Sequence, residues 1–450
     1  MSIESSLRLG RQGLPRSLLE LCERLSAAGH RTWLVGGSVR DSLRAQLEGA
    51  ASTHSWTTKD WDVATDAKPE QVMRVFRRVI PTGIEHGTVT VVFPDLQIEV
   101  TTLRADIGYA DGRRPDQIGF VSDIEEDLAR RDFTVNAIAF EPLSERLFDP
   151  FGGLADLRAR RLRAVGEASR RFAEDGLRVL RAARFVATLG FELDAETARA
   201  IRPSLDTYRK VSAERIREEW NKAFRASEPS RAFAIMQEHG LLEITAPELS
   251  ALAEQVTPSG NRLARALGHL DRCPVRMELR LAALLAEIAP DPKSSAGAAD
   301  GLLARLRYSN AERKFITRLI QHQHLPLALT TTDAELRHWL RRVGPDLVSD
   351  LCALARARMD DPDGGSKALS AFQNRVQAAL ALNPVLSLGG LAIDGNRLIT
   401  EAGVERGRAV GTTLEALLVR VIDDPTLNTP EWLLDEARNM ASGRNSSAPR

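Results

Sequence analysis

The sequence predicts an α+β protein in which a sheet-containing part of about 150 residues precedes an all-helical remainder. Three observations support this prediction. Short runs of strand character are concentrated in the first third of the chain. Residues 149–153, Asp-Pro-Phe-Gly-Gly, then contain a proline and two glycines, which break both strand and helix. From there to about residue 445, segments of helical pattern rich in leucine and alanine are joined by short connections containing proline, glycine and aspartate.

Composition sets limits on the class of protein. A chain of 450 residues exceeds what one hydrophobic core normally organises. It has 43% hydrophobic and 27% charged residues and no run of 18 apolar residues, so no membrane partner is expected. Cys22, Cys273 and Cys352 lie far apart, without metal-ligand or disulfide spacing, which favours a reducing, cytoplasmic location. Net charge is zero, but residues 151–225 hold 17 Lys and Arg against 11 Asp and Glu, which suits either a phosphate backbone or a solvated helical face.

The elements of the first part follow from apolar spacing and turn residues. A helix is expected over residues 15–29 and a strand over 33–35, followed by a helix from about Val39. Residues 46–59, rich in Ala, Ser and Thr, are expected to form an extended loop before a strand over 60–64. The remaining expected elements are a helix over 70–79, a hairpin of strands 89–93 and 98–103, a polar loop over 106–120 and a helix that begins near residues 122–123.

The first candidate site combines two glycines with two aspartates. Gly36 and Gly37 follow the first strand and let backbone N–H groups approach a ligand closely. Ser38 and Arg40 then start a helix, where N–H groups and a cation can hold a triphosphate. A Gly-Gly pair is usually only a turn, and an Asp-x-Asp pair is usually surface charge, so the combination is what makes the motif specific.

Asp60 and Asp62 are separated by one residue. On a strand both carboxylates would lie on one face, with Trp61 and Val63 turned into the core. Two acids that face the same way repel each other unless a cation lies between them, and magnesium prefers such oxygen ligands together with substrate phosphates. The pattern indicates metal-dependent nucleotidyl transfer. Glu99, on the predicted hairpin, is either a third carboxylate of that chemistry or a residue on the solvated face of the hairpin.

A second candidate site lies at the head of a helix predicted over residues 170–190. Glu174 and Arg178 are four residues apart and can pair, while Asp175 and Arg178 project from the same face. An Asp acceptor beside an Arg donor is complementary to cytosine and adenine, each of which presents an amine beside a ring nitrogen, and not to uracil or guanine. The alternative is a simple surface salt bridge, which is common on helices.

The motifs together resemble those of class II CCA-adding tRNA nucleotidyltransferases, which share their fold with bacterial poly(A) polymerases. The resemblance covers roughly residues 15–225, with six motifs in the family's order. They are Gly36-Gly37-Ser38-Val39-Arg40-Asp41, Asp60-Trp61-Asp62, Arg130-Arg131-Asp132-Phe133-Thr134-Val135-Asn136, Asp149-Pro150-Phe151-Gly152-Gly153, Glu174-Asp175-Gly176-Leu177-Arg178 and Ser212-Ala213-Glu214-Arg215-Ile216-Arg217-Glu218-Glu219.

The resemblance implies a nucleotidyltransferase head of polymerase-β-like fold over residues 1–150, a helical neck over 151–235, a tRNA-binding body and tail over 236–440 and a frayed end over 441–450. It implies that Asp60 and Asp62 bind catalytic Mg²⁺ and that Gly36, Gly37, Ser38 and Arg40 hold the triphosphate. Arg131, Asp132 and Asn136 would hold the sugar and phosphates, and Asp175 and Arg178, with Glu174 fixing the guanidinium, would select CTP and ATP. The insert between Ser38 and Asp60 is longer than is usual in the family.

The resemblance implies addition of CCA to the tRNA 3′ end. An enzyme that adds only A differs little in sequence, and poly(A) polymerase is a close competitor that product length would distinguish, so both stay open. A non-catalytic RNA-binding protein with a degenerate head is a further alternative, but retention of both Asp60 and Asp62 counts against it.

Overall fold

The structure of the protein is a computed structural model, which describes residues 9–50, 56, 60–107, 117–258, 260–328, 330–359 and 364–443. The chain divides into two compact units, Met1–Ala251 and Leu252–Arg450. The subdivision into head, neck, body and tail stays a prediction. Within the described ranges, no helix combines the length and the apolar character needed to cross a membrane.

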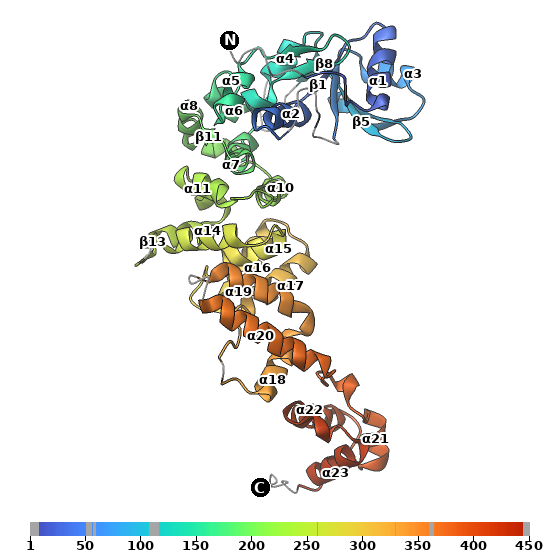
Figure 1. The fold of residues 1–450 in the computed structure, drawn as a ribbon, viewed down its shortest axis with the longest axis vertical. Coiled ribbons are helices and arrows are strands. Elements are labelled where there is room, and N and C mark those ends of the chain that lie inside the picture. Colours follow the sequence, from blue (N-terminus) through green and yellow to red (C-terminus); the bar gives the residue numbers. More distant parts are fainter. Residues whose placement is uncertain are drawn as a thin grey trace. The chain divides into compact units, whose positions relative to one another are not determined.

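A seven-stranded mixed sheet forms the centre of the N-terminal part of the first unit (Figure 1). The strand order is β3-β4-β5-β2-β1-β8-β9, with β2 and β5 parallel and the other neighbours antiparallel. This confirms the predicted α+β class. The strands are β1 (Thr32–Val35), β2 (Asp62–Thr65), β3 (Val79–Gly83), β4 (Thr88–Val92), β5 (Gln97–Thr102), β8 (Ala139–Glu141) and β9 (Arg146–Phe148).

Helices surround this sheet and then continue alone. The first unit contains α1 (Arg16–Ala27), α2 (Gly37–Leu47), α3 (Pro69–Val75), α4 (Ile124–Ala129), α5 (Gly153–Arg158), α6 (Ala168–Glu174), α7 (Leu177–Leu189), α8 (Ala195–Arg199), α9 (Leu205–Tyr208), α10 (Ala213–Ala223), α11 (Ser230–Glu238), α12 (Leu241–Thr245) and α13 (Pro247–Ser250). Two short two-stranded sheets are also present. β6 (Arg104–Ile107) pairs with β7 (Gln117–Phe120) in antiparallel fashion, and β10 (Arg161–Leu162) pairs with β11 (Glu192–Leu193) in parallel fashion.

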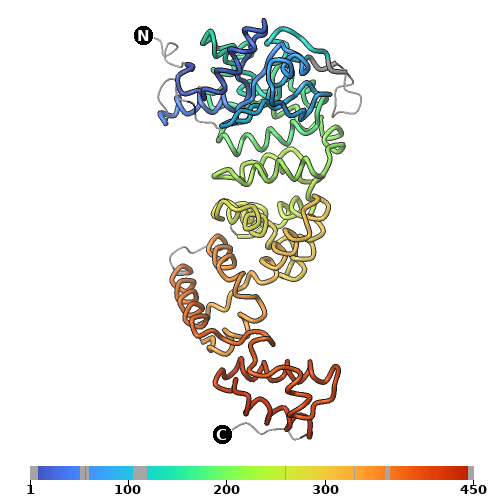
Figure 2. The backbone as a smooth tube through the Cα atoms, turned by 90° about the vertical axis from the view of Figure 1, so that its right-hand side faces the viewer, coloured from blue at the N-terminus to red at the C-terminus, as the bar shows by residue number. Residues whose placement is uncertain are grey.

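The second unit is helical apart from one short hairpin, β12 (Val256–Thr257) and β13 (Gly260–Asn261). In Figure 2 its last helices, drawn in red, lie side by side, and they share a core centred on Leu398, Leu417 and Leu433. Its helices are α14 (Arg262–Arg272), α15 (Met277–Leu285), α16 (Pro292–Arg305), α17 (Asn310–Gln321), α18 (Asp333–Val343), α19 (Val348–Arg358), α20 (Gly364–Ala381), α21 (Gly395–Glu401), α22 (Arg408–Asp423) and α23 (Pro430–Ala441).

The core of the sheet explains which strand residues point inward. All four residues of β1 are buried, because β1 lies between β2 and β8. Trp61 and Val63 are buried, as predicted, and Asp62 faces outward between them. The predicted hairpin is confirmed as β4 and β5, which pair in antiparallel register from Thr88 to Thr101. The three cysteines are buried free thiols.

Three local expectations are wrong. Asp60 lies outside the strand, since β2 begins at Asp62. The loop expected over residues 46–59 begins later than expected, because α2 continues to Leu47. The ends of the expected polar loop 106–120 belong to β6 and β7, and residues 108–116 lie outside the described residues.

The helix expected over residues 170–190 is two helices, α6 and α7, that meet at Asp175 and Gly176. Asp175 has an extended backbone, with φ −145° and ψ 108°. A Cβ atom on Gly176 would lie 2.4 Å from the carbonyl oxygen of Thr207, so the chain passes another backbone segment too closely for any side chain. The break turns Asp175 away from the helical ladder and exposes its carboxylate to a cavity.

Candidate active site

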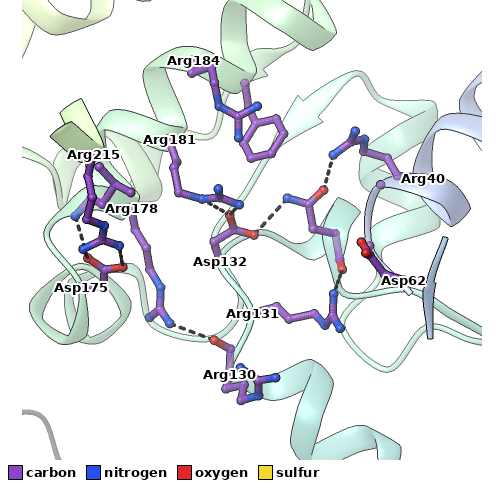
Figure 3. A pocket seen from close by; sticks show the side chains of 15 residues that line it. Arg40, Asp62, Arg130, Arg131, Asp132, Asp175, Arg178, Arg181, Arg184 and Arg215 are labelled. Atoms are coloured by element: carbon purple, nitrogen blue, oxygen red, sulfur yellow. Dashed lines mark hydrogen bonds and ion pairs between the residues drawn. The ribbon is translucent and has the colours of Figure 1, made fainter. Parts of the chain in front are cut away.

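A cavity of about 520 Å³ lies in the first unit, where the sheet meets α7 and α10 (Figure 3). It brings together segments that are far apart in the sequence: the β1–α2 junction, the start of β2, the turn after α4, and α7. Its lining residues are Gly36, Gly37, Arg40, Asp62, Arg130, Arg131, Asp132, Asn136, Asp175, Leu177, Arg178, Arg181, Arg184, Phe185 and Arg215.

The lining carries an excess of positive charge, since seven arginines face three aspartates. Guanidinium groups bind phosphate oxygens through paired N–H donors and stay charged at any physiological pH. A cavity of this composition is suited to a polyanion such as a nucleoside triphosphate. In Figure 3, Asp62 and Asp175 lie at opposite ends of the view, with Arg131, Asp132 and Arg181 between them.

The glycines at the β1–α2 junction are required by backbone geometry. Gly36 has φ +74° and ψ −132°, a conformation that side-chain-bearing residues rarely adopt. A Cβ atom there would lie 3.3 Å from Nη1 of Arg131 and 3.6 Å from Oδ2 of Asp62. Gly36 thus keeps a narrow part of the cavity open between the two charged side chains.

Arg40 projects from α2 into the cavity. Its Nε and Nη2 atoms donate to both carboxylate oxygens of Asp41 at 2.8 Å, and Nη1 donates to Oδ1 of Asn136 at 2.6 Å. These bonds fix the plane of the guanidinium before any ligand arrives. Asp41 therefore acts as an orienting partner for Arg40, which explains its place in the motif.

Asp132 connects the turn after α4 to α7. Oδ1 accepts from the backbone N–H of Phe133 at 2.8 Å and from Nδ2 of Asn136 at 3.0 Å, while Oδ2 accepts from Nε of Arg181 at 2.7 Å. Burial alone would raise the pKa of this carboxyl, but Arg181 and these hydrogen bonds outweigh it and hold the pKa well below the usual range. Asp132 is thus ionised, and Asn136 links it to Arg40.

Asp62 and Glu99 lie side by side on parallel strands, since they are paired residues in the register of β2 and β5. The pKa of Asp62 is raised, chiefly by burial, with Arg131 lowering it and Asp60 raising it further. The pKa of Glu99 is also raised, by burial and then by the charge of Asp62. Negative charge on these two carboxylates is therefore unfavourable in the absence of a compensating cation.

The donor set at Asp60 and Asp62 suits a hard divalent cation. Two carboxylates separated by one residue fit an ion that keeps several waters and takes further oxygens from a substrate's phosphates. Among the described residues, no group of three or more His, Cys, Asp or Glu side chains is arranged to hold a metal ion by itself. One or two carboxylates completed by waters and substrate phosphates are the usual ligands of magnesium in phosphoryl-transfer sites.

Asp175 and Arg178 both line the cavity, but each is already bound by other residues. Arg215 donates to Asp175 from Nη1 at 3.1 Å and from Nη2 at 2.7 Å. Arg178, 9% exposed, donates to Glu174 at 2.6 Å and to the carbonyl oxygens of Arg171 and Arg130 at 2.8 and 2.9 Å. The predicted Glu174–Arg178 pair is confirmed, and both polar side chains are held in fixed orientations.

Four predicted site residues lie outside the lining of this cavity. Ser38 is buried, and its hydroxyl donates to the carbonyl oxygen of Val35 at 3.2 Å. Glu174 reaches the cavity only through Arg178, and Asp60 and Glu99 flank Asp62. The functional roles of these residues stay predictions.

Several lining residues were not predicted to have a role in the site. Arg181, Arg184 and Phe185 extend the face of α7 that carries Arg178. The three-residue spacing of the arginines could have indicated this shared face. Arg184 donates to Glu219 of α10 at 2.5 Å, and burial lowers the pKa of Arg184 to about 10, an effect that Glu219 opposes and Arg181 reinforces. Arg215 belongs to a quoted motif, but its partner Asp175 is 40 residues away, so no local signal identified the pair.

Comparison with known proteins places the chain in a family. Residues 32–163 match the "Poly A polymerase head domain" and residues 190–252 match the "Probable RNA and SrmB-binding site of polymerase A". The CCA-adding enzyme of Lactobacillus helveticus is 34% identical over 413 residues, which are 92% of this chain and 94% of that enzyme. The chain belongs to the CCA-adding enzyme family.

Two further comparisons describe how far the likeness to CCA-adding enzymes extends. The CCA-adding enzyme of Lactobacillus gasseri is 44% identical over 225 residues, so that alignment covers 50% of this chain and about half (54%) of the relative's length. A crystal structure of the Bacillus stearothermophilus CCA-adding enzyme in complex with CTP has a TM-score of 0.73 and 28% identity, and covers 95% of this chain and 98% of that chain. The fold of CCA-adding enzymes therefore extends over both units.

Proposed function

We propose that this chain is a template-independent tRNA nucleotidyltransferase, which adds C, C and A to the tRNA 3′ end from CTP and ATP. One observation carries the proposal. A single cavity holds Asp62 at one end and the Asp175–Arg178 pair at the other, with arginines between them. This order matches a nucleotide that has its reacting phosphate at the carboxylates and its base at the Asp–Arg pair.

Base selection follows from the hydrogen-bonding groups at the far end of the cavity. Asp175 offers acceptors and Arg178 offers donors, which together complement the amine and ring nitrogen of cytosine or adenine. Arg178 uses three of its five N–H donors on Glu174, Arg171 and Arg130, so its plane is fixed before the base arrives. A preoriented donor discriminates between bases because it cannot turn to suit the wrong one.

The arginines and glycines of the cavity would bind the rest of the nucleotide. Gly36, Gly37, Ser38 and Arg40 would hold the triphosphate, where the backbone of α2 begins and Asp41 orients Arg40. Arg131, Asp132 and Asn136 would hold the sugar and phosphates. Leu177 and Phe185 supply apolar surface beside the base and sugar.

Asp60 and Asp62 would hold Mg²⁺, which when bound lowers the pKa of the attacking tRNA 3′-hydroxyl and neutralises charge at the α-phosphate. The 3′-oxygen then forms a bond to the α-phosphorus, and the bond to the pyrophosphate leaving group breaks. Glu99 would contribute either as a third carboxylate or by adding negative charge beside Asp62. CCA-adding enzymes are nucleotidyltransferases that generally use divalent metals.

Poly(A) synthesis is the second candidate, favoured by the match of residues 32–163 to the poly(A) polymerase head domain. A-only addition to tRNA ending in CC is a third. Product length separates all three. The non-catalytic alternative conflicts with the presence of Asp62 in an arginine-lined cavity. A cytoplasmic location is part of the proposal and rests on the reduced, separate cysteines.

Incubation of the protein and magnesium with tRNA that lacks its 3′ terminus, and separately with tRNA ending in CC, tests the proposal. Each substrate is supplied with CTP, ATP, both, UTP or GTP. We expect three nucleotides and no more on the first substrate when CTP and ATP are both present. Extension of only the CC-ended tRNA would indicate an A-adding enzyme, and long A tails would indicate a poly(A) polymerase.

A further inference from the structure

Between the end of α2 and Asp60, the side chain of Trp56 lies against the head. The Trp56 ring lies 5.4 Å from the ring of Trp61, at an angle of 58°, and 5.5 Å from the ring of Phe140, at an angle of 56°. Its Nε1 donates to the carbonyl oxygen of Gly10 at 2.9 Å. Trp56 thus joins three segments of the chain, and its polar atom is satisfied where its ring is packed.

The two ring partners of Trp56 connect it to the candidate catalytic carboxylates. Trp61 stands between Asp60 and Asp62 and is 5% exposed. Phe140 is fully buried on β8 and pairs with Leu34 of β1, at the centre of the sheet. Because the strand pairing of β2 begins at Asp62, the backbone at Asp60 is not part of that ladder. Trp61 links Asp60 to the start of that ladder, so the packing of Trp61 bears on the position of Asp60 relative to Asp62.

We propose that Trp56 is a positioning residue for Asp60 and Asp62. It packs on Trp61 and, through its ring contact with Phe140 and its hydrogen bond to Gly10, ties that residue to β8 and to the chain near residue 10. The inference rests on the proposed nucleotidyl transfer. It gives Trp56 a function in this chain, namely to fix the spacing of the two carboxylates that would share a divalent cation. Small displacements of such groups reduce rates strongly.

The test compares Trp56→Ala, Trp56→Leu and Trp56→Phe with the wild-type full-length protein. Mn²⁺ is the probe, titrated in the presence of CTP and without tRNA, and its binding is followed by the loss of the free-ion EPR signal. We expect Trp56→Ala to weaken Mn²⁺ binding and to lower kcat by about tenfold, with the KM for tRNA unchanged. Trp56→Phe keeps a ring at this position and should restore most of both.

Trp56→Leu separates positioning from simple coverage of an apolar surface. Leucine fills much of the space but offers no ring to Trp61 and Phe140, so it should resemble Trp56→Ala in Mn²⁺ affinity. If Trp56→Ala does not fold, the comparison of Trp56→Leu with Trp56→Phe carries the test. Trp339→Leu is the matched control, since Trp339 in the second unit packs on Phe372 at 5.3 Å and should leave Mn²⁺ affinity unchanged.

If Trp56→Ala binds Mn²⁺ as tightly as the wild type and has the same kcat, Trp56 does not position the carboxylates. An increase in the KM for tRNA with Mn²⁺ affinity unchanged would also overturn the positioning role, because the insert would then contact RNA instead of supporting the carboxylates. Failure of the proposed function is distinguishable. In that case the wild-type protein would transfer no nucleotide, whereas the Mn²⁺ titrations would still report whether Trp56 supports a cation site.

Discussion

Both carboxylate oxygens of Asp175 accept hydrogen bonds from Arg215 of α10, at distances of 3.1 and 2.7 Å. Asp175 lies at the break between α6 and α7, where its Oδ1 also accepts from the backbone N–H of Leu177 at 3.0 Å and its carbonyl oxygen accepts from the N–H of Arg178. Arg215 and the N–H of Leu177 together set the direction in which Asp175 presents its remaining lone pairs to the cavity. A carboxylate held in this way can accept a hydrogen bond from a base without reorienting.

Arg215→Ala should reduce discrimination between nucleotides, because the Asp175 carboxylate then keeps the Leu177 N–H on one oxygen and can turn about that bond to suit other bases. We expect kcat/KM for CTP to fall by about tenfold, the worth of one charge-assisted pair, and addition of UTP to rise relative to CTP. Single-nucleotide addition to tRNA lacking its 3′ terminus measures both. Arg209→Ala, which removes an exposed arginine of the same unit, is the control. Unchanged selectivity in Arg215→Ala would mean that Asp175 is oriented by the backbone alone.

Arg178→Ala should affect base selection more than phosphate binding. The guanidinium lies at the base end of the cavity and is fixed by Glu174, so its loss removes the donor half of the Asp–Arg pair. We expect selectivity for CTP over UTP to fall by about 10- to 100-fold, as for loss of one hydrogen-bonding group to a base. Competition assays with mixed nucleotides measure this ratio. If Arg178→Ala still rejects UTP and GTP to the same extent as the wild type, Asp175 and Arg178 do not select the base.

Asp60→Ala should abolish nucleotidyl transfer and leave tRNA binding intact. The lesion removes one of two carboxylates proposed to hold magnesium and leaves the arginines of the cavity in place. Transfer assays over a range of magnesium concentrations, together with filter binding of tRNA, separate the two effects. Glu85→Ala, at an exposed position in the same part of the head, is a suitable control. Substantial residual transfer by Asp60→Ala in magnesium would contradict the assignment.

As the pH is lowered, the rate of transfer should begin to fall at a higher pH than it would if Asp62 had the pKa of an ordinary aspartate. Burial and Asp60 raise the pKa of Asp62, so its carboxylate is protonated, and loses its ability to hold a cation, as the pH falls through that raised value. Burial and the charge of Asp62 also raise the pKa of Glu99, so if protonation of Glu99 contributes to this acid limb, Glu99→Gln should move the limb to lower pH. Profiles of kcat/KM against pH measure the shift.

Glu99→Gln also decides between the two interpretations of Glu99. If Glu99 only adds negative charge beside Asp62, the variant keeps most of its rate at neutral pH and shows the shifted acid limb. If Glu99 is a third metal-binding carboxylate, the rate at neutral pH falls by orders of magnitude. An unshifted profile with a normal rate would exclude both interpretations and assign Glu99 to the solvated face of β5.

Asp132→Asn should destabilise the first unit by roughly 2 to 3 kcal/mol at neutral pH, because the charge of Arg181 loses its buried partner. The pKa of Asp132 is lower in the folded protein than in the unfolded chain, so its stabilisation is present above the unfolded pKa and lost as the pH falls through the folded one. The unfolding free energies of wild type and variant should therefore converge in acid. Chemical denaturation at several pH values measures this.

Asp206→Asn is the control for that experiment. Asp206 pairs with Arg209 at 4.0 Å on the surface, so its replacement should change stability by less than about 0.5 kcal/mol. Equal effects of the two variants would show that the Asp132–Arg181 pair contributes no more than an exposed ion pair.

The features that the sequence determined by itself are those with a local physical cause. Gly36 was predicted because glycines after a strand let the backbone bend and bring its N–H groups close to a ligand, and its positive φ agrees with that reason. Periodicity predicted the paired strands β4 and β5 and the helical character of the remainder. Capping predicted the helix whose N-cap is Asp123. The order of the short motifs identified the family.

The tertiary structure alone decided which residues face one another across the cavity. Arg215 meets Asp175 over 40 residues, and Arg181 meets Asp132 over 49, and no periodic pattern links positions so far apart. The break at Gly176 likewise depends on the backbone of Thr207, which packs against it from a distant segment. Local sequence reports the conformational preference of a segment, whereas these contacts depend on how segments pack, which hydrophobic burial across the whole unit determines.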